Sequence, residues 1–181
     1  MGTRYLPAED TRLLGEALRG YTGERCLEIG FGSGALLEGV APRFDLAVGT
    51  DVIGLRDASQ ASSGSAGLVL ADRAACFREG VFDLVFFNPP YVPSGEVEDR
   101  AVDGGPTGTE VPLAFVEEGA RVMKRDGTMV ALLSEEGDLG RFVSECARLG
   151  LDAKRVSQRR LFYETLVVFE VRRRPTLIRK P

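Results

Sequence analysis

The chain has 181 residues, of which 44% are hydrophobic and 28% charged, and its formal net charge is −4. These values are ordinary for one globular domain with its own core, and the negative charge argues against a nucleic acid backbone as the main partner. The chain has no histidine and three widely spaced cysteines, which excludes histidine catalysis and indicates neither a disulfide framework nor a zinc site. With no apolar run of about 18 residues, we expect a single cytoplasmic domain over residues 1–181 that has no contact with a membrane.

The first predicted helix covers residues 9–19, where apolar side chains recur at helical spacing. Asp10 and Thr11 both have side chains suited to its N-cap. The stretch at its start, residues 5–11, is either an ordinary helix entry with a capping carboxylate or a flap that lies over a ligand. We therefore treat residues 1–20 as an N-terminal flap and helix.

A glycine-rich loop follows the first predicted strand, residues 25–29, and a helix begins after it at Ala35. The loop contains three alternating glycines, Gly30, Gly32 and Gly34. Glycine permits positive φ and a close approach of a ligand to the backbone, and the helix start offers free N–H groups. The spacing differs from the dinucleotide-binding pattern, and the carboxylate of Glu28 would repel a pyrophosphate. A ligand with a cationic end, such as an amino acid, suits this loop better.

Two further predicted strands end in acidic residues. The apolar run 46–51 ends in Asp51, about 20 residues after the glycine loop, where a ribose-binding carboxylate belongs. The run 68–72 ends in Asp72, whose carboxylate can accept a hydrogen bond from an adenine amino group. Capping of a following helix is the alternative for both acids. Small and polar residues at 59–67 predict a surface loop between the two strands.

The most informative stretch begins with the apolar run 82–87, which predicts a strand buried on both faces. Asn88-Pro89-Pro90-Tyr91 follows it. Pro89 cannot continue a sheet ladder, and Pro90 fixes the path by which the chain leaves the strand. A polar amide is thus held at the carboxyl end of a strand, where open parallel sheets bind ligands. The alternative is a plain turn in which Asn88 is a turn former and Tyr91 belongs to the core.

Asn88 and its neighbours suit a ligand that carries an amide or an exocyclic amine. The Asn88 side chain has a carbonyl acceptor, and the carbonyl of Pro89 provides a second acceptor near the same point. Two acceptors match a planar –NH₂ group, which has two protons to donate. The ring of Tyr91 can lie flat against such a group.

The rest of the chain alternates between helices and strands and closes on a hairpin. Residues 94–109 form a long loop, and loops of this length in compact domains are functional or mobile. The later predicted elements are a helix over 111–123, a turn at Asp126-Gly127, a strand over 128–133, a helix over 139–149 stopped by Gly150, and two strands over 153–157 and 166–171. Residues 172–181 form a basic tail, which we interpret as a solvated end. The pattern predicts an open, mostly parallel α/β sheet with helices on both faces.

The ordered motifs resemble those of class I S-adenosylmethionine-dependent methyltransferases: Glu28-x-Gly30-x-Gly32-x-Gly34, Asp51, Asp72 and Asn88-Pro89-Pro90-Tyr91. The Asn-Pro-Pro-Tyr motif narrows the resemblance to methylation of an amino or amide nitrogen. Four segments are similar to the short HemK/PrmC-type glutamine methyltransferases of archaea and eukaryotes: Tyr5-x-Pro7-Ala8-Glu9-Asp10-Thr11, Asn88-Pro89-Pro90-Tyr91-Val92, Gly104-Gly105 through Gly108-x-Glu110-Val111, and Glu164-Thr165-Leu166. The chain departs from the family pattern at Leu6, Asp103, Pro106 and Thr109. The resemblance implies a Rossmann-like, seven-stranded, mostly parallel sheet with a C-terminal antiparallel hairpin, and no N-terminal helical domain of the bacterial kind.

The resemblance also implies roles for individual residues. Asn88, Pro89, Pro90 and Tyr91 would be catalytic, and together with Val92 they would bind the substrate. The methyl donor S-adenosyl-L-methionine, which leaves as S-adenosyl-L-homocysteine, would be bound by Thr11, Glu28, Gly30, Gly32, Gly34, Asp51, Asp72, Arg73 and Asn88. The substrate would be the glutamine of the Gly-Gly-Gln motif in a peptide chain release factor. A small zinc-binding activator subunit, which works with the eukaryotic relatives, would have to be a separate chain.

Three other functions fit parts of the sequence. An N6-adenine methyltransferase on DNA or RNA uses the same Asn-Pro-Pro-Tyr chemistry on a flipped base, but it usually needs a basic surface or a target-reading domain. A protein lysine methyltransferase is compatible with the same pocket chemistry. A non-enzymatic donor-binding subunit is the third alternative, and the intact Asn88, Glu28 and Asp51 argue against it.

Overall fold

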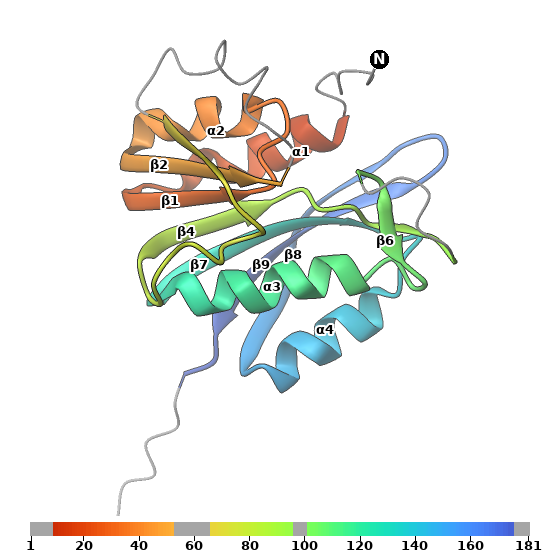
Figure 1. Ribbon diagram of the computed structural model, residues 1–181. Coiled ribbons are helices and arrows are strands. Elements are labelled where there is room, and N and C mark those ends of the chain that lie inside the picture. The colour runs from red at the N-terminus through yellow and green to blue at the C-terminus, as the bar shows by residue number, and fades with distance from the viewer. Residues whose placement is uncertain (1–8, 53–65, 96–100, 176–181) are drawn as a thin grey trace, which may run out of the picture.

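A computed structural model describes residues 9–52, 66–95 and 101–175 of the chain. Its main feature is a seven-stranded sheet in the order β3-β2-β1-β4-β7-β9-β8 (Figure 1). The strands are β1 (Gly23–Ile29), β2 (Phe44–Asp51), β3 (Ala66–Leu70), β4 (Phe82–Phe87), β7 (Met123–Ser134), β8 (Leu151–Arg160) and β9 (Thr165–Arg173). Strands β1, β2, β3, β4 and β7 are parallel, whereas β9 is antiparallel to both β7 and β8. This confirms the predicted mostly parallel sheet with a C-terminal antiparallel hairpin.

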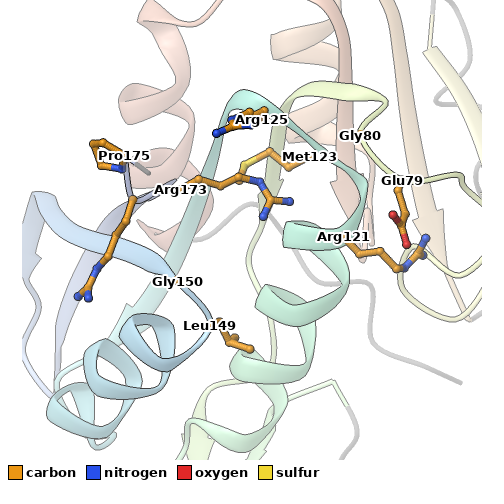
Figure 2. Close-up of a pocket in the computed structure, with 10 residues that line it drawn as sticks. Glu79, Gly80, Arg121, Met123, Arg125, Leu149, Gly150, Arg173 and Pro175 are labelled. Carbon is orange, nitrogen blue, oxygen red and sulfur yellow. The ribbon is translucent and has the colours of Figure 1, made fainter. Parts of the chain in front are cut away.

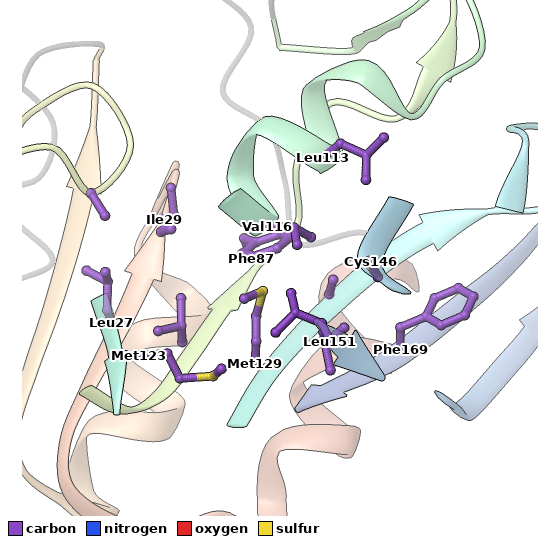
Figure 3. Packing of buried hydrophobic residues seen from close by; sticks show 14 of the residues in the cluster. Leu27, Ile29, Phe87, Leu113, Val116, Met123, Met129, Cys146, Leu151 and Phe169 are labelled. Atoms are coloured by element: carbon purple, nitrogen blue, oxygen red, sulfur yellow. The ribbon is translucent and has the colours of Figure 1, made fainter. Parts of the chain in front are cut away.

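Helices cover both faces of the sheet. Those in the described part of the chain are α1 (Glu9–Ala17), α2 (Ala35–Val40), α3 (Glu110–Val122) and α4 (Leu139–Arg148), with short 3₁₀ turns at Leu18–Gly20 and Ala41–Arg43. Helices α1 and α2 pack on one face, where Leu14 and Leu37 join a cluster that includes Phe86. Helices α3 and α4 pack on the other face, where Val116 joins a cluster with Phe87 (Figure 3). Strand β4 is buried on both faces, which explains its continuous apolar run.

The direction in which successive strands are added to the sheet reverses between β1 and β4, although the two strands are parallel. From β1 the chain passes outward to β2 and then to β3, whereas β4 pairs with the opposite side of β1. The carboxyl ends of β1 and β4 therefore flank the point at which connections leave in opposite directions, and ligands bind at such points in open α/β sheets. Glu28 and Asn88 both lie at this edge, which we call the carboxyl edge of the sheet.

The predicted turn at Asp126-Gly127 is wrong, because β7 continues through it. The pairing of β4 with β7 shifts between Phe82↔Met123 and Leu84↔Thr128, so the extra residues of β7 form a bulge. A Cβ atom at Gly127 would lie 2.6 Å from Cγ of Met123. Glycine is thus needed for a tight bend within the strand, although the same residue pair is typical of a turn.

The segment 94–109 is not entirely a loop. Strand β6 (Asp103–Gly105) pairs in parallel with β5 (Val92–Pro93), and the two form a small second sheet. The expected basic tail also begins later than predicted. Strand β9 includes Arg172, which pairs with Glu170, and ends at Arg173, which donates to the Ala120 carbonyl at 2.5 Å. Inter-element hydrogen bonds therefore hold the first residues of that segment in the sheet.

Several smaller boundaries also differ. Strand β3 begins at Ala66, inside the loop expected over 59–67, and the rest of that loop lies outside the described residues. Strand β8 is longer than the predicted 153–157 because hairpin pairing with β9 extends it to Arg160. Residues 1–8, which include the first part of the expected flap, also lie outside the described residues. Within the described ranges, no helix has the length and apolar character needed to cross a membrane.

Candidate active site

The glycine loop between β1 and α2 has the backbone conformation that the sequence predicts. Its three glycines have φ values in the left-handed region: +75° at Gly30, +50° at Gly32 and +79° at Gly34. The N–H of Gly32 donates to Oδ2 of Asp51 at 3.0 Å, and the N–H of Gly30 donates to the Thr50 carbonyl at 2.7 Å. The end of β2 thus holds the loop, and Asp51 and the glycines lie together as expected.

Glu28 is a buried carboxyl group at the end of β1, with 2% of its surface exposed. Burial raises the pKa of Glu28 well above its usual value. A hydrogen bond from the Leu37 backbone opposes this shift, and the nearby charge of Asp51 adds to it. Across the described residues, Oε2 of Glu28 finds no hydrogen-bond partner. Since buried oxygens in native proteins normally have a partner, Glu28 is suited to a ligand that brings N–H donors.

Asn88 leaves β4 directly after Phe87 and contacts α1. Its Nδ2 donates a hydrogen bond of 2.8 Å to Oδ2 of Asp10. Oδ1 of Asn88 is buried, and no atom of the described chain is its hydrogen-bond partner. An amide acceptor is therefore available at the carboxyl edge, as the Asn-Pro-Pro-Tyr motif predicts.

Asp10 is the residue that the sequence reasoning did not place in the site. The predicted N-cap at Asp10 or Thr11 is wrong, because α1 begins at Glu9 and both residues lie inside its first turn. Asp10 is 4% exposed and contacts Asn88, which is 78 residues away in the sequence. Only its position in the segment of family resemblance could have drawn attention to it.

A glycine-rich segment packs against Tyr91. A Cβ atom at Gly104 would lie 2.6 Å from Cα of Tyr91, and one at Gly108 would lie 2.5 Å from the Tyr91 carbonyl oxygen. Side chains larger than hydrogen would therefore displace the backbone that follows Asn88. The Tyr91 side chain is half-buried against the cluster that α1 and α2 cover.

Glu110 holds this glycine-rich segment in place. Its carboxylate accepts hydrogen bonds from the Thr107 N–H at 3.0 Å and from the Arg141 guanidinium. Burial alone would raise the pKa of Glu110, but these hydrogen bonds, together with one from its own backbone N–H, outweigh burial and lower the pKa to about 2. The sequence pattern did not predict roles for Thr107 and Arg141. Their side chains contact each other only because α4 packs beside α3.

Asp72 and Arg73 follow β3 and lie next to the end of β2, where the Ala71 N–H donates to the Asp51 carbonyl at 3.0 Å. Arg73 has a φ of +47°, and within the described ranges it is the only residue other than glycine with a positive φ. Such a conformation costs roughly 1–2 kcal/mol for a residue with a Cβ atom. The Asp72 side chain is exposed and pairs with Arg73 at 3.2 Å.

The remaining predicted site residues also lie at the carboxyl edge. Pro89 is buried, Pro90 is half-buried, and Val92 is exposed at the start of β5. Thr11 is half-buried in the first turn of α1, where its N–H donates to Oδ1 of Asp10 at 2.6 Å. All of the predicted site residues thus gather at one edge of the sheet.

A cleft of about 900 Å³ opens at the opposite edge, where β4 and β7 begin (Figure 2). Its lining includes four arginines: Arg121, Arg125, Arg173 and Arg174. Arg121 donates to the carbonyls of Ala74 and Phe77, both at 2.8 Å, and thus fastens the chain after β3 to α3. This cleft contains none of the predicted site residues, and we place the candidate active site at the carboxyl edge.

Comparisons with known proteins agree with this fold. A putative protein N5-glutamine methyltransferase of Methanocaldococcus jannaschii is 27% identical over 175 residues, which are 91% of this chain and 89% of that protein. A release factor glutamine methyltransferase of Bradyrhizobium diazoefficiens is 34% identical over 128 residues, which are 59% of this chain and 42% of that protein. The E. cuniculi Mtq2-Trm112 complex, responsible for methylation of the eRF1 translation termination factor, superposes with a TM-score of 0.78 at 28% identity and covers 94% of this chain and 98% of the other. No family model matches the chain.

The fold is that of the class I methyltransferases. Within that class, the chain is a relative of the protein N5-glutamine methyltransferases and the release factor glutamine methyltransferases. The resemblance carried by the sequence motifs is thereby confirmed.

Proposed function

We propose that this enzyme transfers the methyl group of S-adenosyl-L-methionine to the side-chain nitrogen of the glutamine in the Gly-Gly-Gln motif of a peptide chain release factor. The observation that carries the proposal is the buried Oδ1 of Asn88, which lacks a partner within the described residues, next to the Pro89 carbonyl. These two acceptors suit the two protons of a primary amide. The names of the curated relatives support the same reaction.

The residues at the carboxyl edge fit the methyl donor. Oε2 of Glu28, buried and without a partner in the described chain, suits the ammonium group of the methionine part, and the Gly30 to Gly34 loop would lie along it. Asp51 would accept hydrogen bonds from the ribose hydroxyls. Asp72 and the backbone of Arg73 would bind the adenine, and Thr11 would help to close the pocket. The donor supplies a methyl group on a cationic sulfur and leaves as S-adenosyl-L-homocysteine.

The role of the protein is to aim a poor nucleophile, because the lone pair of an amide nitrogen is delocalised. Oδ1 of Asn88 and the carbonyl of Pro89 accept its two N–H bonds and hold the nitrogen in one orientation. The same acceptors favour the positive charge that develops on the nitrogen during transfer. Tyr91 packs against the amide plane. The proton leaves the nitrogen after transfer, so no residue has to act as a general base beforehand.

The tip of the β8–β9 hairpin supports a protein as the substrate. Phe162 and Tyr163 at this tip are 91% and 86% exposed, and their ring centroids lie 4.8 Å apart. The tip extends beyond the carboxyl end of β7, on the same edge as Asn88 (Figure 1). Exposed aromatic side chains are typical anchors of protein interfaces. We assign this aromatic pair to contact with the release factor outside its Gly-Gly-Gln loop.

The proposal includes a small zinc-binding activator subunit, by analogy with the Trm112 partner of the E. cuniculi protein. It places the enzyme in the cytoplasm, where release factors act. An N6-adenine methyltransferase remains the alternative from another substrate class, and the net charge of −4 argues against it.

The proposal is tested by methyl transfer from labelled donor to purified release factor, with and without an activator subunit. We expect label on the intact factor and none on a factor whose Gly-Gly-Gln glutamine is replaced by alanine. RNA and DNA serve as competing substrates in parallel reactions. Label on the altered factor, or methyl-adenine as the product, would contradict the glutamine assignment.

A further inference from the structure

The carboxylate of Asp10 joins the first turn of α1 to Asn88. One oxygen accepts from Nδ2 of Asn88 at 2.8 Å, and the other accepts from the Thr11 N–H at 2.6 Å. We propose that Asp10 is a positioning residue, which fixes the Asn88 amide so that Oδ1 faces the acceptor nitrogen. This inference deepens the proposed function and rests on it for the identity of the substrate.

The direction of the Asp10–Asn88 contact follows from chemistry. An ionised carboxylate only accepts hydrogen bonds, so the amide of Asn88 must present its NH₂ group to Asp10. If the amide turned over, Oδ1 would face the carboxylate and two acceptors would repel each other. A neutral asparagine at position 10 would not impose this direction, because its side chain can donate as well as accept.

The fixed orientation determines which ligand Asn88 can hold. With NH₂ toward Asp10, Asn88 presents only a carbonyl oxygen at the carboxyl edge, and this oxygen suits a ligand that has N–H groups to donate. With the amide turned over, Asn88 would present its own N–H groups to the N–H groups of the substrate. The hydrogen bond to a charged acceptor also polarises the amide and makes Oδ1 a stronger acceptor.

Asp10 is well placed for this role because α1 is anchored at both ends of its length. Leu13 and Leu14 are buried beneath the helix. Arg159 of β8 pairs with Glu9 and Glu16, in each case at 2.9 Å. The side chain that orients Asn88 thus comes from a packed helix, which holds an orientation more closely than a loop does.

The kinetic test uses the full chain, four single variants and one double variant. Asp10→Ala should lower kcat on the release factor by roughly 10–100-fold, the scale of one hydrogen bond to a charged group, and leave donor affinity unchanged. Asp10→Asn keeps the shape of the side chain and one acceptor, so its kcat should lie between those of Asp10→Ala and the unaltered enzyme. Asp45→Ala, which removes an exposed acid at the start of β2, is the matched control and should keep full activity. Adding Asp10→Ala to Asn88→Ala should cause no further loss, because the orientation of a missing amide has no effect.

A structural test does not need the substrate. In a ¹⁵N-labelled protein, the Asn88 side-chain NH₂ signals should show slow exchange with water and two well-separated proton shifts. Asp10→Ala should accelerate the exchange and bring the two shifts together. Unchanged NH₂ signals in a folded Asp10→Ala protein, or a full additional loss of kcat in the double variant, would overturn the inference. If the release factor is not methylated at all, the proposed function fails, while these signals still decide the role of Asp10.

Discussion

The two edges of the central sheet differ in how the chain satisfies the hydrogen bonds of an acidic side chain. At the amino edge, Oδ2 of Asp83 accepts from the backbone N–H groups of Glu24 and Arg25 at 3.1 and 2.8 Å, and Oδ1 accepts from Nζ of Lys124 at 2.7 Å. Burial alone would raise the pKa of Asp83, but these hydrogen bonds lower it below its usual value. At the carboxyl edge, burial raises the pKa of Glu28, and one of its oxygens has no partner in the described chain.

This contrast separates an acid that joins strands from an acid that suits a ligand. Asp83 is ionised, and both of its carboxylate oxygens accept hydrogen bonds from donors that the chain itself provides, so it stabilises the start of β4. Glu28 lies on the neighbouring strand β1, and the described chain provides no hydrogen-bond donor for one of its carboxylate oxygens. The Asn88 amide shares that property, since its Oδ1 also lacks a partner among the described residues. We therefore propose that the edge with these unpartnered oxygens is the functional one.

The largest effect that this contrast predicts is at Asn88. Asn88→Ala should lower the rate of methyl transfer by about 10²–10³, because one oriented acceptor in a dry site is lost. Donor affinity should stay largely intact, since other residues hold the donor. Asn88→Asp keeps an acceptor oxygen but places a second carboxylate against Asp10, so it should also impair transfer substantially. Single-turnover kinetics measure the transfer rate, and calorimetry measures donor affinity. Near-normal transfer by Asn88→Ala would show that Asn-Pro-Pro-Tyr is only a turn without a catalytic role.

Glu28→Gln should weaken donor binding by about tenfold to a hundredfold, the scale of a charge-assisted hydrogen bond. It should also raise the free energy of unfolding of the ligand-free protein at neutral pH. Because the folded-state pKa of Glu28 is raised, its contribution to stability is complete below the unfolded value of about 4.5 and is lost as the pH rises through the folded value. Denaturant titrations from pH 4 to 8 should show a flatter profile in Glu28→Gln; parallel profiles would contradict this account.

Asp51→Ala should weaken donor affinity by at least roughly tenfold while the fold survives, because two hydrogen bonds to ribose hydroxyls are lost. Loss of the Gly32 N–H contact adds to this effect, since the glycine loop is then held less firmly. Calorimetry with the donor gives the affinity, and an unchanged value would remove Asp51 from the site.

Asp83→Asn at the satisfied edge should change stability alone. We expect a loss of about 1–2 kcal/mol in the free energy of unfolding, with kcat and donor affinity unchanged. Since the pKa of Asp83 is lowered, its contribution is present above the unfolded value of 3.8 and is lost as the pH falls through the folded value. Asp45→Asn, an exposed acid on β2, is the matched control. A kcat defect in Asp83→Asn would show that the two edges are not independent.

The sequence predicts the parts of the site that depend on local pattern. Apolar runs closed by an acid or an amide placed Glu28, Asp51 and Asn88 at the ends of parallel strands. Parallel strands bring such ends to one edge, so the gathering of these residues follows from the fold class alone. The positive φ values in the glycine loop likewise follow from the residue type.

The contacts that were missed all join segments far apart in the chain. Asp10 was interpreted as a cap because its own neighbourhood gives no sign of Asn88. Gly104 and Gly108 were noted only through resemblance, and their physical reason is the backbone of Tyr91. The residues at the Gly127 bulge are also typical of a turn, and only the pairing of β7 with β4 distinguishes a bulge from a turn. Local pattern cannot decide such cases, since tertiary packing determines them.

The place of Tyr91 beside Asn88 has an optical consequence. The chain contains four tyrosines and no tryptophan, so its ultraviolet emission comes from tyrosine alone. Tyr21 donates to the Glu170 carboxylate at 2.5 Å, and a carboxylate at that distance quenches phenol emission. Replacing Tyr5 and the exposed Tyr163 by phenylalanine would remove their signals from the background. A glutamine amide that packs on the Tyr91 ring would then alter the fluorescence of Tyr91 itself. Binding of the substrate loop could therefore be followed in real time without an attached dye.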